Sequence, residues 1–501
     1  MLPAGKWVQS IYNNFRASVL ISFLLVVTKC LYRPNYEHGL LSRLSISKCI
    51  VIKDIIIISV VVTSVSIIYS LIGISAWQHE AQSRPALGLN NENITSHEAE
   101  LNPEPQIKDK NIKAELVFEG MMNPTSMAFL ADNDILFLEL FNGTVFRLID
   151  GVLQPEPILD VNVSRVVGER GMLGIAVTKE LDRTYVFLYY TEANVDNGLP
   201  IGNRLYRYEF TENKLVNPKL ILDLPVYPGP FHNGGAITIG PDGNVYIPIG
   251  NLEDVDAEVE TFSSTKTQNI EDGEKPDGSG GILRVTPDGK VVGDGILSNE
   301  YPLNLYYAYG IRNSFGIDFD PVTGNLWDTE NGPNYGDEIN LVEPGFNSGW
   351  RRVQGIWYDN HHEIGNTVKG IPQGLVDFNG KGKYSDPEFT WKSKGPGLTA
   401  LKFLDSDKLG KQYENDIFVG DVHNGNLYYF KIDENRKELM LDPPLDDKVV
   451  EDEEELEDII FGQGFTGGIT DIELGEDGYL YIVSGIWSDE GKIYRLIPIT
   501  E

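Results

Sequence analysis

His232 is the histidine whose neighbours most favour catalysis. It lies in the segment GPFHNGGAITIGPDG. A proline-containing loop comes before it, and a pair of glycines and then an expected strand come after it. An imidazole gains or loses its proton near neutral pH, so a histidine that reaches a central pocket can act as a general base. The alternative is an ordinary loop histidine without a chemical role.

Arg312 and Asn313 form a second candidate pair. They lie in YAYGIRNSFGIDFDP, in a loop between the end of one expected strand and the start of the next. A guanidinium in such a loop can hold a carboxylate or stabilise a developing oxyanion, because it donates several charge-assisted hydrogen bonds. The alternative is a structural ion pair with a neighbouring part of the fold.

The segment TENGPNYGDEINLVEPGFNSGW supplies a set of oxygen ligands. The backbone carbonyls of Gly332 and Pro333 are close in sequence to the carboxylates of Glu330, Asp337 and Glu338. Hard oxygen ligands of this kind suit Ca²⁺ better than a transition metal. The spacing is not that of an EF-hand loop, and the alternative is a tight turn with solvated acids.

Three further groups give weaker signals. Glu169 and Arg170, in GERGMLGIAV, precede a glycine-flanked strand and can either face a pocket or pair with each other. His361 and His362 are adjacent in an expected loop, with surface metal binding as the functional alternative. The acidic run at 451–458 (EDEEELED) is interpreted as a solvated insertion, with cation binding as its alternative.

A turn followed by an apolar or aromatic strand recurs six times, at 132–140, 183–190, 241–250, 322–330, 414–422 and 476–485. Each copy is followed by a second strand pattern, at 143–149, 203–210, 280–289, 337–345, 425–433 and 491–499. Six such pairs, divided by Gly, Asp, Asn and Pro, predict an all-β fold, a six-bladed β-propeller. Because the spacing is uneven, a β-sandwich or two all-β domains remain alternatives. In a propeller, insertions between the strands account for the uneven spacing, and such loops would build a site on one face.

The composition excludes several classes of protein. The 501 residues carry 41 Lys and Arg against 74 Asp and Glu, a net charge of −33. This argues against a nucleic-acid-binding protein, because phosphate binding needs a basic surface. The chain has two cysteines, Cys30 and Cys49, which excludes a disulfide-rich scaffold and a Cys-rich metal site.

The N-terminal segment differs from the rest in charge. Residues 1–54 hold seven basic and two acidic residues, which leaves 34 basic and 72 acidic residues, a net charge of −38, in the remainder. Residues 55–77 contain no charged residue and are numerous enough to cross about 30 Å of hydrocarbon as a helix. The basic flank predicts that residues 1–54 are cytoplasmic and that the acidic bulk lies outside the cell membrane, on the extracellular or periplasmic side.

This interpretation divides the chain into four parts. They are a basic cytoplasmic segment at 1–54, a transmembrane anchor at 55–77, a flexible linker at 78–111 and the propeller at 112–501. A weaker apolar stretch at 17–27 is a candidate for an additional helix. The alternative to a retained anchor is a cleaved signal peptide, although its apolar core would be shorter and nearer the N-terminus.

Four segments in this order, GERGMLGIA, FHNGGAITIGPDGNVYIPIGN, YGIRNSFGIDFDP and TENGPNYGDEIN, resemble the glucose/sorbosone dehydrogenases. The resemblance covers about residues 114–498. It implies a six-bladed propeller in which pyrroloquinoline quinone lies over the central channel, held by Ca²⁺ and by cationic side chains. It also implies that a histidine takes the proton of a sugar's anomeric hydroxyl while hydride passes to the quinone, so that the chain is an oxidoreductase acting on aldoses.

The resemblance implies a role for each matching residue. His232 matches the catalytic base and Glu169 a polar substrate contact, while Arg312 and Asn313 match the pair beside the quinone. The remaining matches are two calcium ligands, Gly332 and Pro333, and three cofactor contacts, Trp391, Ser393 and His423, the last of these in place of a lysine.

One segment departs from the family pattern. Where proven quinone enzymes show Arg-x-Arg-Asp, this chain has Gly468-Ile469-Thr470-Asp471, so the three carboxylates of the quinone lose cationic partners. Three cations are candidates to replace them, namely Lys392, Lys394 and Arg170. The departure keeps a second function open, a non-catalytic propeller that binds a ligand or a protein. A calcium-dependent lactonase-type hydrolase ranks last, since no cage of Glu, Asn and Asp is evident.

Overall fold

The computed structural model describes residues 104–165, 168–254, 261–356, 374–392, 394–486 and 490–499. Residues 1–77, with the predicted anchor, and most of the predicted linker lie outside this description, as do Ser393, His361 and His362. In the part of the chain that is described, no helix is both long and apolar enough to cross a membrane. The described strands all belong to one compact unit, Glu100–Glu501.

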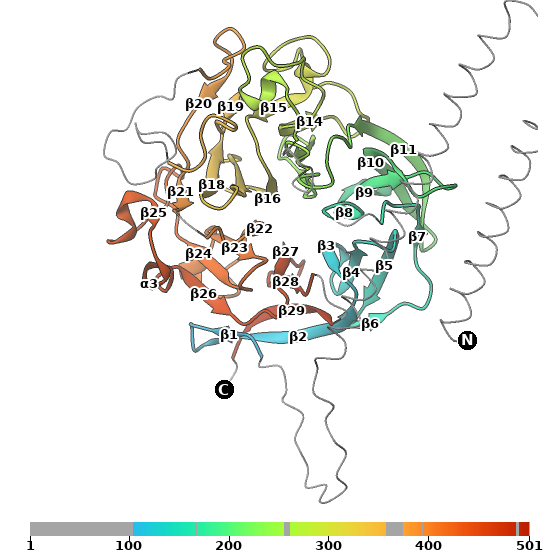
Figure 1. Cartoon of the computed structure of the whole chain (residues 1–501). Coiled ribbons are helices and arrows are strands. Elements are labelled where there is room, and N and C mark those ends of the chain that lie inside the picture. The colour runs from blue at the N-terminus through green and yellow to red at the C-terminus, as the bar shows by residue number, and fades with distance from the viewer. Residues whose placement is uncertain are drawn as a thin grey trace, which may run out of the picture. The chain divides into compact units, whose positions relative to one another are not determined.

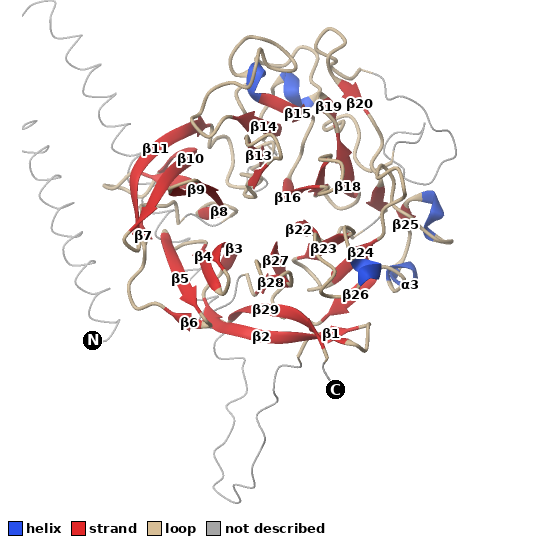
Figure 2. Ribbon diagram, turned by 180° about the vertical axis from the view of Figure 1, so that it is seen from behind, coloured by secondary structure: helices blue, strands red, loops and turns tan. Residues whose placement is uncertain are grey.

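Strands and loops make up nearly all of this unit, and its helical segments are short (Figure 2). The described helical segments comprise one α-helical turn and four 3₁₀ turns: α3 (Glu453–Leu456), η1 (Lys266–Gln268), η2 (Leu303–Leu305), η3 (Lys411–Tyr413) and η4 (Leu445–Asp447). The described strands form six sheets, whose innermost strands are β3, β8, β12, β16, β22 and β27.

The first two sheets are each built from consecutive strands, and the third adds two strands from further along the chain. The first contains β3 (Pro124–Ala131), β4 (Asp134–Glu139), β5 (Thr144–Ile149) and β6 (Val152–Leu153), with β7 (Leu159–Asp160) also paired to β5. The second contains β8 (Met172–Glu180), β9 (Arg183–Ala193), β10 (Pro200–Thr211) and β11 (Lys214–Leu224). The third contains β12 (Thr238–Ile239), β13 (Val245–Ile249), β14 (Gly281–Val285), β15 (Tyr306–Tyr309), β19 (Phe346–Asn347) and β20 (Lys383–Tyr384).

The other three sheets combine distant segments. The fourth contains β16 (Ser314–Phe319), β17 (Leu326–Glu330), β18 (Asp337–Val342), β21 (Phe389–Trp391) and β25 (Val449–Val450). The fifth contains β22 (Leu398–Phe403), β23 (Ile417–Asp421), β24 (Leu427–Phe430), β26 (Ile460–Gln463) and β1 (Gln106–Ile107). The sixth contains β27 (Ile469–Leu474), β28 (Leu480–Ser484), β29 (Gly491–Pro498) and β2 (Ile112–Met121).

The six predicted strand pairs are all formed as antiparallel neighbours. They are β4–β5, β9–β10, β13–β14, β17–β18, β23–β24 and β28–β29, one pair in each sheet. The sequence encodes these pairs clearly because each first strand is an uninterrupted buried run, such as Val245–Ile249, that follows a turn. In the turn before β13, the Asp242 carboxylate accepts the backbone N–H of Asn244, and Gly243 adopts the positive φ that such turns need.

The sheets surround a common centre in the manner of a propeller (Figure 1). Their innermost strands contact one another in order, from β3 through β8, β12, β16 and β22 to β27, and β27 in turn contacts β3. The ring closes within the sixth sheet, where β2 from the start of the unit pairs with β29 from its end. This arrangement confirms the predicted all-β class.

Part of the segment predicted as a linker forms a strand. Gln106 and Ile107, assigned to the linker at 78–111, form β1 and pair with Gln463 and Gly462 of β26. The side chain of Tyr413 also donates a hydrogen bond to Asp109 at 2.8 Å. A two-residue strand has no sequence period of its own, so the paired edge of the fifth sheet decides its structure.

Apolar side chains fill the spaces between neighbouring sheets. One buried cluster joins Trp327 and Phe389 of the fourth sheet to Phe403 and Val419 of the fifth. Another joins strands of the first sheet to strands of the sixth. Each fully buried aromatic side chain of this kind contributes about 1.5–3 kcal/mol to folding.

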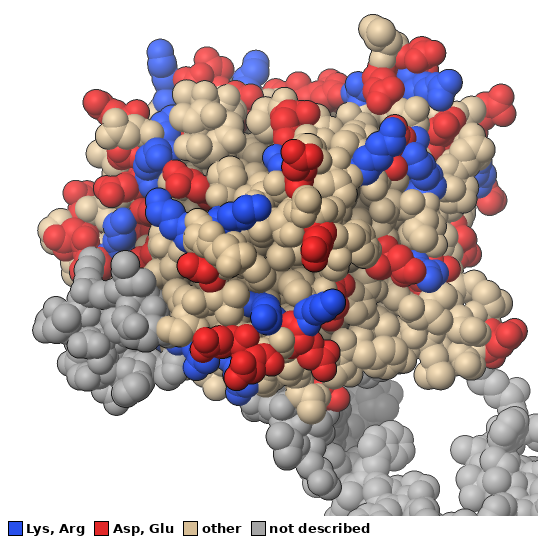
Figure 3. All heavy atoms as spheres, turned by 90° about the horizontal axis from the view of Figure 1, so that it is seen from above, with Lys and Arg blue, Asp and Glu red and all other residues tan. Residues whose placement is uncertain are grey.

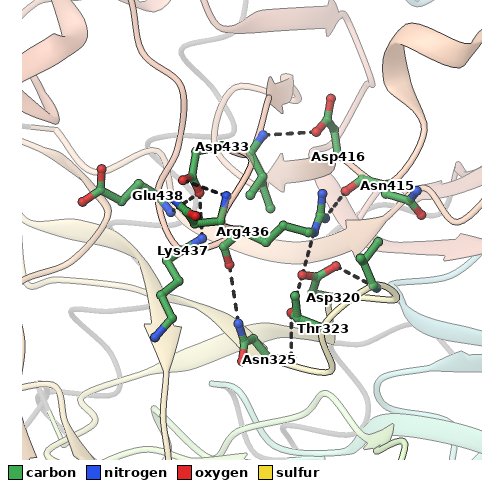
Figure 4. A network of polar contacts seen from close by, with 12 residues as sticks. Asp320, Thr323, Asn325, Asn415, Asp416, Asp433, Arg436, Lys437 and Glu438 are labelled. Carbon is green, nitrogen blue, oxygen red and sulfur yellow. Dashed lines mark hydrogen bonds and ion pairs between the residues drawn. The ribbon is translucent and has the colours of Figure 1, made fainter.

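Arg436 links the fourth and fifth sheets by polar contacts as well (Figure 4). Its Nε donates to Asp320 Oδ2 at 2.7 Å, and its Nη2 donates to the carbonyl of Asn415. The Asp320 carboxylate also accepts the backbone N–H of Val322 at 3.0 Å and the hydroxyl of Thr323 at 2.5 Å. This network fixes the β16–β17 turn against the loops that flank β23 and β24.

The surface carries charges of both signs. On the face in Figure 3, basic side chains lie among the more numerous acidic ones. Exposed ion pairs such as Lys437–Glu343, at 3.0 Å, are part of this pattern. Pairs of this kind contribute about 1 kcal/mol or less to stability, so they serve solubility more than folding.

Candidate active site

One cavity of about 550 Å³ lies at the centre of the ring. All six innermost strands contribute to its wall, for example through Ser126 of β3, Ile175 of β8 and Thr238 of β12. The loops that precede these strands supply His232, Arg312 and further residues. A propeller axis therefore gathers side chains that are far apart in the sequence into one chamber.

His232 lines this cavity and is buried. Its Nδ1 lies 2.5 Å from Asn251 Oδ1 and 3.2 Å from Glu253 Oε2. Burial, reinforced by the nearby Arg312 guanidinium, lowers the pKa of His232 to about 3. At neutral pH the imidazole is uncharged, which is the protonation state a general base requires.

The backbone around His232 is held in an uncommon conformation. His232 has a φ of +60°, in the left-handed region that non-glycine residues rarely occupy. Its loop passes so close to the next one that a Cβ on Gly229 would lie 2.1 Å from the carbonyl oxygen of Glu253. Strained backbone of this kind persists where the surroundings hold it, often at functional sites.

Glu169 lines the cavity beside His232. One carboxylate oxygen accepts the backbone N–H of His232 at 2.6 Å. Burial raises the pKa of Glu169 to about 7, against the lowering effect of that hydrogen bond and of Arg312. The carboxyl group is therefore able to carry or release a proton near neutral pH, while it fixes the loop that holds His232.

Arg312 is buried at the edge of the cavity and makes contacts in three directions. Its Nη1 donates to the carbonyls of Asn331 and Gly332, both at 2.8 Å, and its Nη2 donates to Glu253 at 3.2 Å. The guanidinium also lies 5.4 Å from the ring of Trp350. Neighbouring Asn313 is buried too and lines the cavity, so both predicted residues reach it.

Gly332 and Pro333 line the same end of the cavity. The backbone N–H of Gly332 donates to Asp337 Oδ1 at 2.9 Å, and the other oxygen of Asp337 accepts the N–H of Gly397 at 2.9 Å. A Cβ at Gly332 would lie 1.9 Å from the carbonyl oxygen of Tyr335, so this turn requires glycine. Asp337 thus shapes the turn, and the Gly332 carbonyl faces the guanidinium of Arg312.

A second acidic group lies behind this turn. Asp328, Glu330 and Glu338 are all buried, and the backbone N–H of Arg312 donates to Glu330 at 2.6 Å. Burial raises the pKa of Asp328 to about 7 and that of Glu330 to about 8. Burial raises the pKa of Glu338 as well, and the Glu330 charge adds to that increase.

The other predicted site residues are placed differently. Trp391 belongs to the core of the fourth sheet, where its ring centroid lies 4.9 Å from that of Phe389, and it is not among the residues that line the cavity. His423 lines the cavity, is exposed, and has its Nδ1 3.1 Å from the carbonyl oxygen of Gly395. Ser393 lies outside the described residues.

Of the three candidate replacement cations, only Lys394 lines the cavity, where it pairs with Glu453 at 3.4 Å. Lys392 pairs with Glu451 instead, at 2.6 Å. The guanidinium of Arg170 donates to the carbonyls of Val226 and Gly229, so it holds a loop rather than facing the cavity.

Three further lining residues form a charged group deeper in the cavity. Lys402 follows the start of β22 by four positions, roughly 13 Å along the strand. It pairs with Glu473 at 2.8 Å and with Asp318 at 3.6 Å. Asp471 accepts hydrogen bonds from Ser126 and from the backbone of Met127, and burial raises its pKa to about 7. This end offers one cation among three carboxyl groups.

Sequence reasoning missed Asn251 and Glu253, which contact His232, and Lys402 and Glu473 at the deeper end. Asn251 and Glu253 follow β13 directly, and the ends of strands at a central channel are where site residues gather. Lys402 is the one charged residue in β22, and such a residue in a largely apolar strand is a signal for an inward-facing polar site, whereas Glu473 alternates with Asp471 in β27 and gives no such isolated signal. Nothing in the sequence shows that these residues meet.

Comparison with known proteins identifies relatives of this chain. The family model described as glucose/sorbosone dehydrogenase matches residues 121–495. The aldose sugar dehydrogenase of Escherichia coli is 24% identical over 394 residues, which is 77% of this chain and 93% of that protein. Quinoprotein glucose dehydrogenase B of Acinetobacter calcoaceticus is 28% identical over 322 residues, which is 59% of this chain and 65% of that protein.

Solved structures show the same architecture. The PQQ-bound aldose sugar dehydrogenase of Streptomyces coelicolor gives a TM-score of 0.55 at 22% identity and covers 77% of this chain and 97% of its own. The aldose sugar dehydrogenase of Escherichia coli, in its apo form, gives a TM-score of 0.58 at 20% identity and covers 77% of this chain. At these identities the likeness shows the fold.

Proposed function

This chain belongs to the glucose/sorbosone dehydrogenase family, and on that premise we propose that it oxidises aldose sugars at the anomeric hydroxyl with a quinone cofactor. The observation that carries the proposal is the shared cavity of His232 and Arg312. An uncharged, buried imidazole and a buried guanidinium line one chamber of about 550 Å³. A nitrogen of each lies 3.2 Å from the same oxygen of Glu253.

The cavity fits an anionic quinone better at one end than at the other. At the His232 end, Arg312, Lys394 and His423 offer two cations and an imidazole. At the deeper end, Lys402 is already paired with Glu473, and Asp471 stands close by. We therefore assign the quinone, the PQQ that is bound in a relative of the same fold, to the His232 end.

Calcium fits this geometry less well. In the residues described, no group of three or more His, Cys, Asp or Glu side chains is arranged to hold a metal ion. The carbonyl of Gly332, one of the two proposed ligands, accepts a hydrogen bond from Arg312. A cation at Gly332 and Pro333 would therefore lie next to the Arg312 guanidinium and without a cage of carboxylates in the described residues, so we derive no step through calcium.

The chain's own residues account for proton removal and orientation. Oxidation of an aldose to its lactone removes the proton of the C1 hydroxyl and, from C1 itself, a hydride. When bound, a quinone supplies the two-electron acceptor for that hydride. His232, uncharged at neutral pH, takes the hydroxyl proton, and Glu169 beside it orients the sugar by hydrogen bonding. Arg312 stabilises negative charge that develops on an oxygen at this end of the cavity.

The same proposal extends to architecture and location. We propose that the six sheets are the six blades of one propeller, since each contributes its innermost strand to the cavity wall. We also propose that residues 55–77 anchor the chain in the cell membrane with the propeller on the extracellular or periplasmic side. The uncharged run and the charge asymmetry around it support this.

A titration of the full-length protein with PQQ, with and without Ca²⁺, tests the function. Cofactor absorbance reports binding, and dye reduction with a panel of aldoses reports turnover. We expect micromolar binding and aldose-dependent dye reduction. An absence of binding at micromolar quinone would contradict the proposal and favour the second candidate, a non-catalytic propeller that binds another ligand or a protein. The carboxyl groups of Asp471 and Glu473 at the deeper end favour that candidate, because they repel an anionic cofactor.

A further inference from the structure

Glu253 contacts both His232, which takes a proton in the proposed reaction, and Arg312, which stabilises negative charge. We propose that Glu253 is a positioning residue that fixes His232 in the tautomer with the proton on Nδ1, and so leaves the lone pair of Nε2 to act as the base. The inference rests on the proposed function for its role in catalysis, whereas the tautomer itself does not depend on any reaction.

Two oxygen atoms surround His232 Nδ1. Asn251 Oδ1 lies at 2.5 Å and Glu253 Oε2 at 3.2 Å. A carboxylate oxygen can only accept a hydrogen bond, and so can the oxygen of an amide. Nδ1 must therefore carry the hydrogen, because an unprotonated Nδ1 would place its lone pair against both oxygens.

Asn251 alone would not settle the tautomer. If its amide rotated by half a turn, its NH₂ group would face the ring and would favour the opposite tautomer. Glu253 has no such alternative, since a carboxylate that pairs with a guanidinium, as it does with Arg312 at 3.2 Å, has only acceptor oxygens. Glu253 is thus the residue that decides which nitrogen of His232 is free.

The charged groups that face His232 come from three separate loops. Glu169 precedes β8, Glu253 follows β13 and Arg312 precedes β16. Among them, Glu253 contacts the ring nitrogen, Glu169 contacts the backbone, and Arg312 holds Glu253 from the other side. Among these charged groups, Glu253 is therefore the one that contacts Nδ1.

The backbone holds Glu253 against the His232 loop. The N–H of Gly229 donates to the carbonyl of Leu252 at 3.0 Å, and the N–H of Phe231 donates to the carbonyl of Glu253 at 3.1 Å. Leu252 has a φ of +54°, in the left-handed region, which turns the chain so that the next side chain enters the site. The approach of the two loops is thus fixed before any substrate arrives.

Nuclear magnetic resonance of the full-length protein, labelled with ¹⁵N in its histidines, tests the tautomer without cofactor or sugar. Loss of one set of signals in His232→Gln assigns the residue. We expect a pyrrole-type Nδ1 and a pyridine-type Nε2 in the wild type at pH 7. In Glu253→Gln we expect a mixture or a reversal, and in Glu253→Asp the wild-type tautomer. A pyridine-type Nδ1 of His232 in the wild-type protein would overturn the proposal even if both Glu253 variants failed to fold.

Kinetics on the quinone-loaded protein test the consequence for catalysis. By analogy with residues that orient a functional histidine, Glu253→Gln should lower kcat about 10- to 100-fold with little change in KM, and Glu253→Asp should restore part of the loss. The matched control is Glu388→Gln, which removes a carboxylate paired with Lys448, outside the cavity. A wild-type kcat and tautomer in Glu253→Gln would refute the inference. Absence of sugar oxidation in the wild type would refute the proposed function and leave the tautomer result standing.

Discussion

Two buried ion pairs in this protein, Arg312–Glu253 and Arg436–Asp320, have the same chemistry and different surroundings. In both, an arginine and a carboxylate with little exposure lie within hydrogen-bond distance, at 3.2 Å and 2.7 Å respectively. Arg436–Asp320 connects two sheets (Figure 4), whereas Arg312–Glu253 borders the central cavity through Arg312.

The two pairs differ in how far the protein itself satisfies them. Asp320 also accepts hydrogen bonds from Val322 and Thr323, so protein groups surround its carboxylate, and we call Arg436–Asp320 the closed pair. In the other pair, Glu253 also contacts the ring of His232, and Arg312 Nε is buried without a hydrogen-bond partner in the described residues. We call Arg312–Glu253 the open pair. A closed pair contributes to folding, while an open pair at a cavity retains groups that can act on a ligand.

The largest effect should come from changing His232, which contacts the open pair and not the closed pair. Replacing His232 by Ala removes the proposed base, so kcat for aldose oxidation should fall about 10²- to 10⁴-fold. Dye reduction measures kcat, and cofactor absorbance should show that the quinone still binds. Turnover that stays near the wild-type rate would remove His232 from this role.

The next effect should distinguish the two arginines. Arg312→Met and Arg436→Met each leave a buried carboxylate unpaired, so each should lower the free energy of unfolding by about 3–5 kcal/mol. Urea unfolding of the full-length protein measures this loss.

Quinone binding should separate the variants. Only Arg312→Met should weaken it, because Arg436 does not line the cavity. Equal binding by the two variants would contradict the distinction between an open and a closed pair. Lys437→Met, in an exposed pair, is the matched control and should change stability by about 1 kcal/mol or less.

The sequence predicts the pairs of strands better than it predicts the pairs of charges. Buried runs such as Val245–Ile249 carry their own signal, and turn residues mark their ends. His232, Arg312 and Gly332 stand in distinctive motifs, which is why they could be found. Glu253 could not, because its importance lies in the meeting of two loops, and nothing local encodes that contact. Trp391 shows the converse, since a residue near cofactor contacts in the sequence belongs to the core.

Buried carboxylates without an arginine side-chain partner contribute a stability whose pH dependence should have the opposite sign to that of a salt-bridged acid. Burial raises the folded-state pKa of Asp328 to about 7 and of Glu330 to about 8, above the values of an unfolded chain. The folded state then binds more protons than the unfolded state between about pH 4 and pH 8. The stability they contribute is complete at low pH and is lost as the pH rises, by up to about 1.4 kcal/mol per pH unit and group.

Asp328→Asn tests this expectation. Urea unfolding between pH 5 and pH 8, in the presence of a chelator, should show a smaller loss of stability with pH in the variant than in the wild type. Glu343→Gln, which removes an exposed carboxylate, should leave the pH dependence unchanged. A steeper loss in Asp328→Asn would contradict the raised pKa.

The smallest effect should come from an exposed pair at the cavity. Lys394 and Glu453 are each 85% exposed, so Lys394→Ala should change the free energy of unfolding by less than about 1 kcal/mol. Because Lys394 lines the cavity, the same change should weaken quinone binding more at low salt than at high salt. Titration at two ionic strengths measures this, and a salt-independent result would exclude Lys394 as a partner of the cofactor.

His232 and the Arg312–Glu253 pair together form the proposed site for sugar oxidation. Anaerobic rapid mixing of the quinone-loaded protein with an aldose, unlabelled or deuterated at C1, tests it most directly. We expect reduction of the bound quinone in a single turnover, a slower rate with the deuterated sugar, and a much slower rate in His232→Ala. Failure of any aldose to reduce a quinone that is demonstrably bound would contradict it.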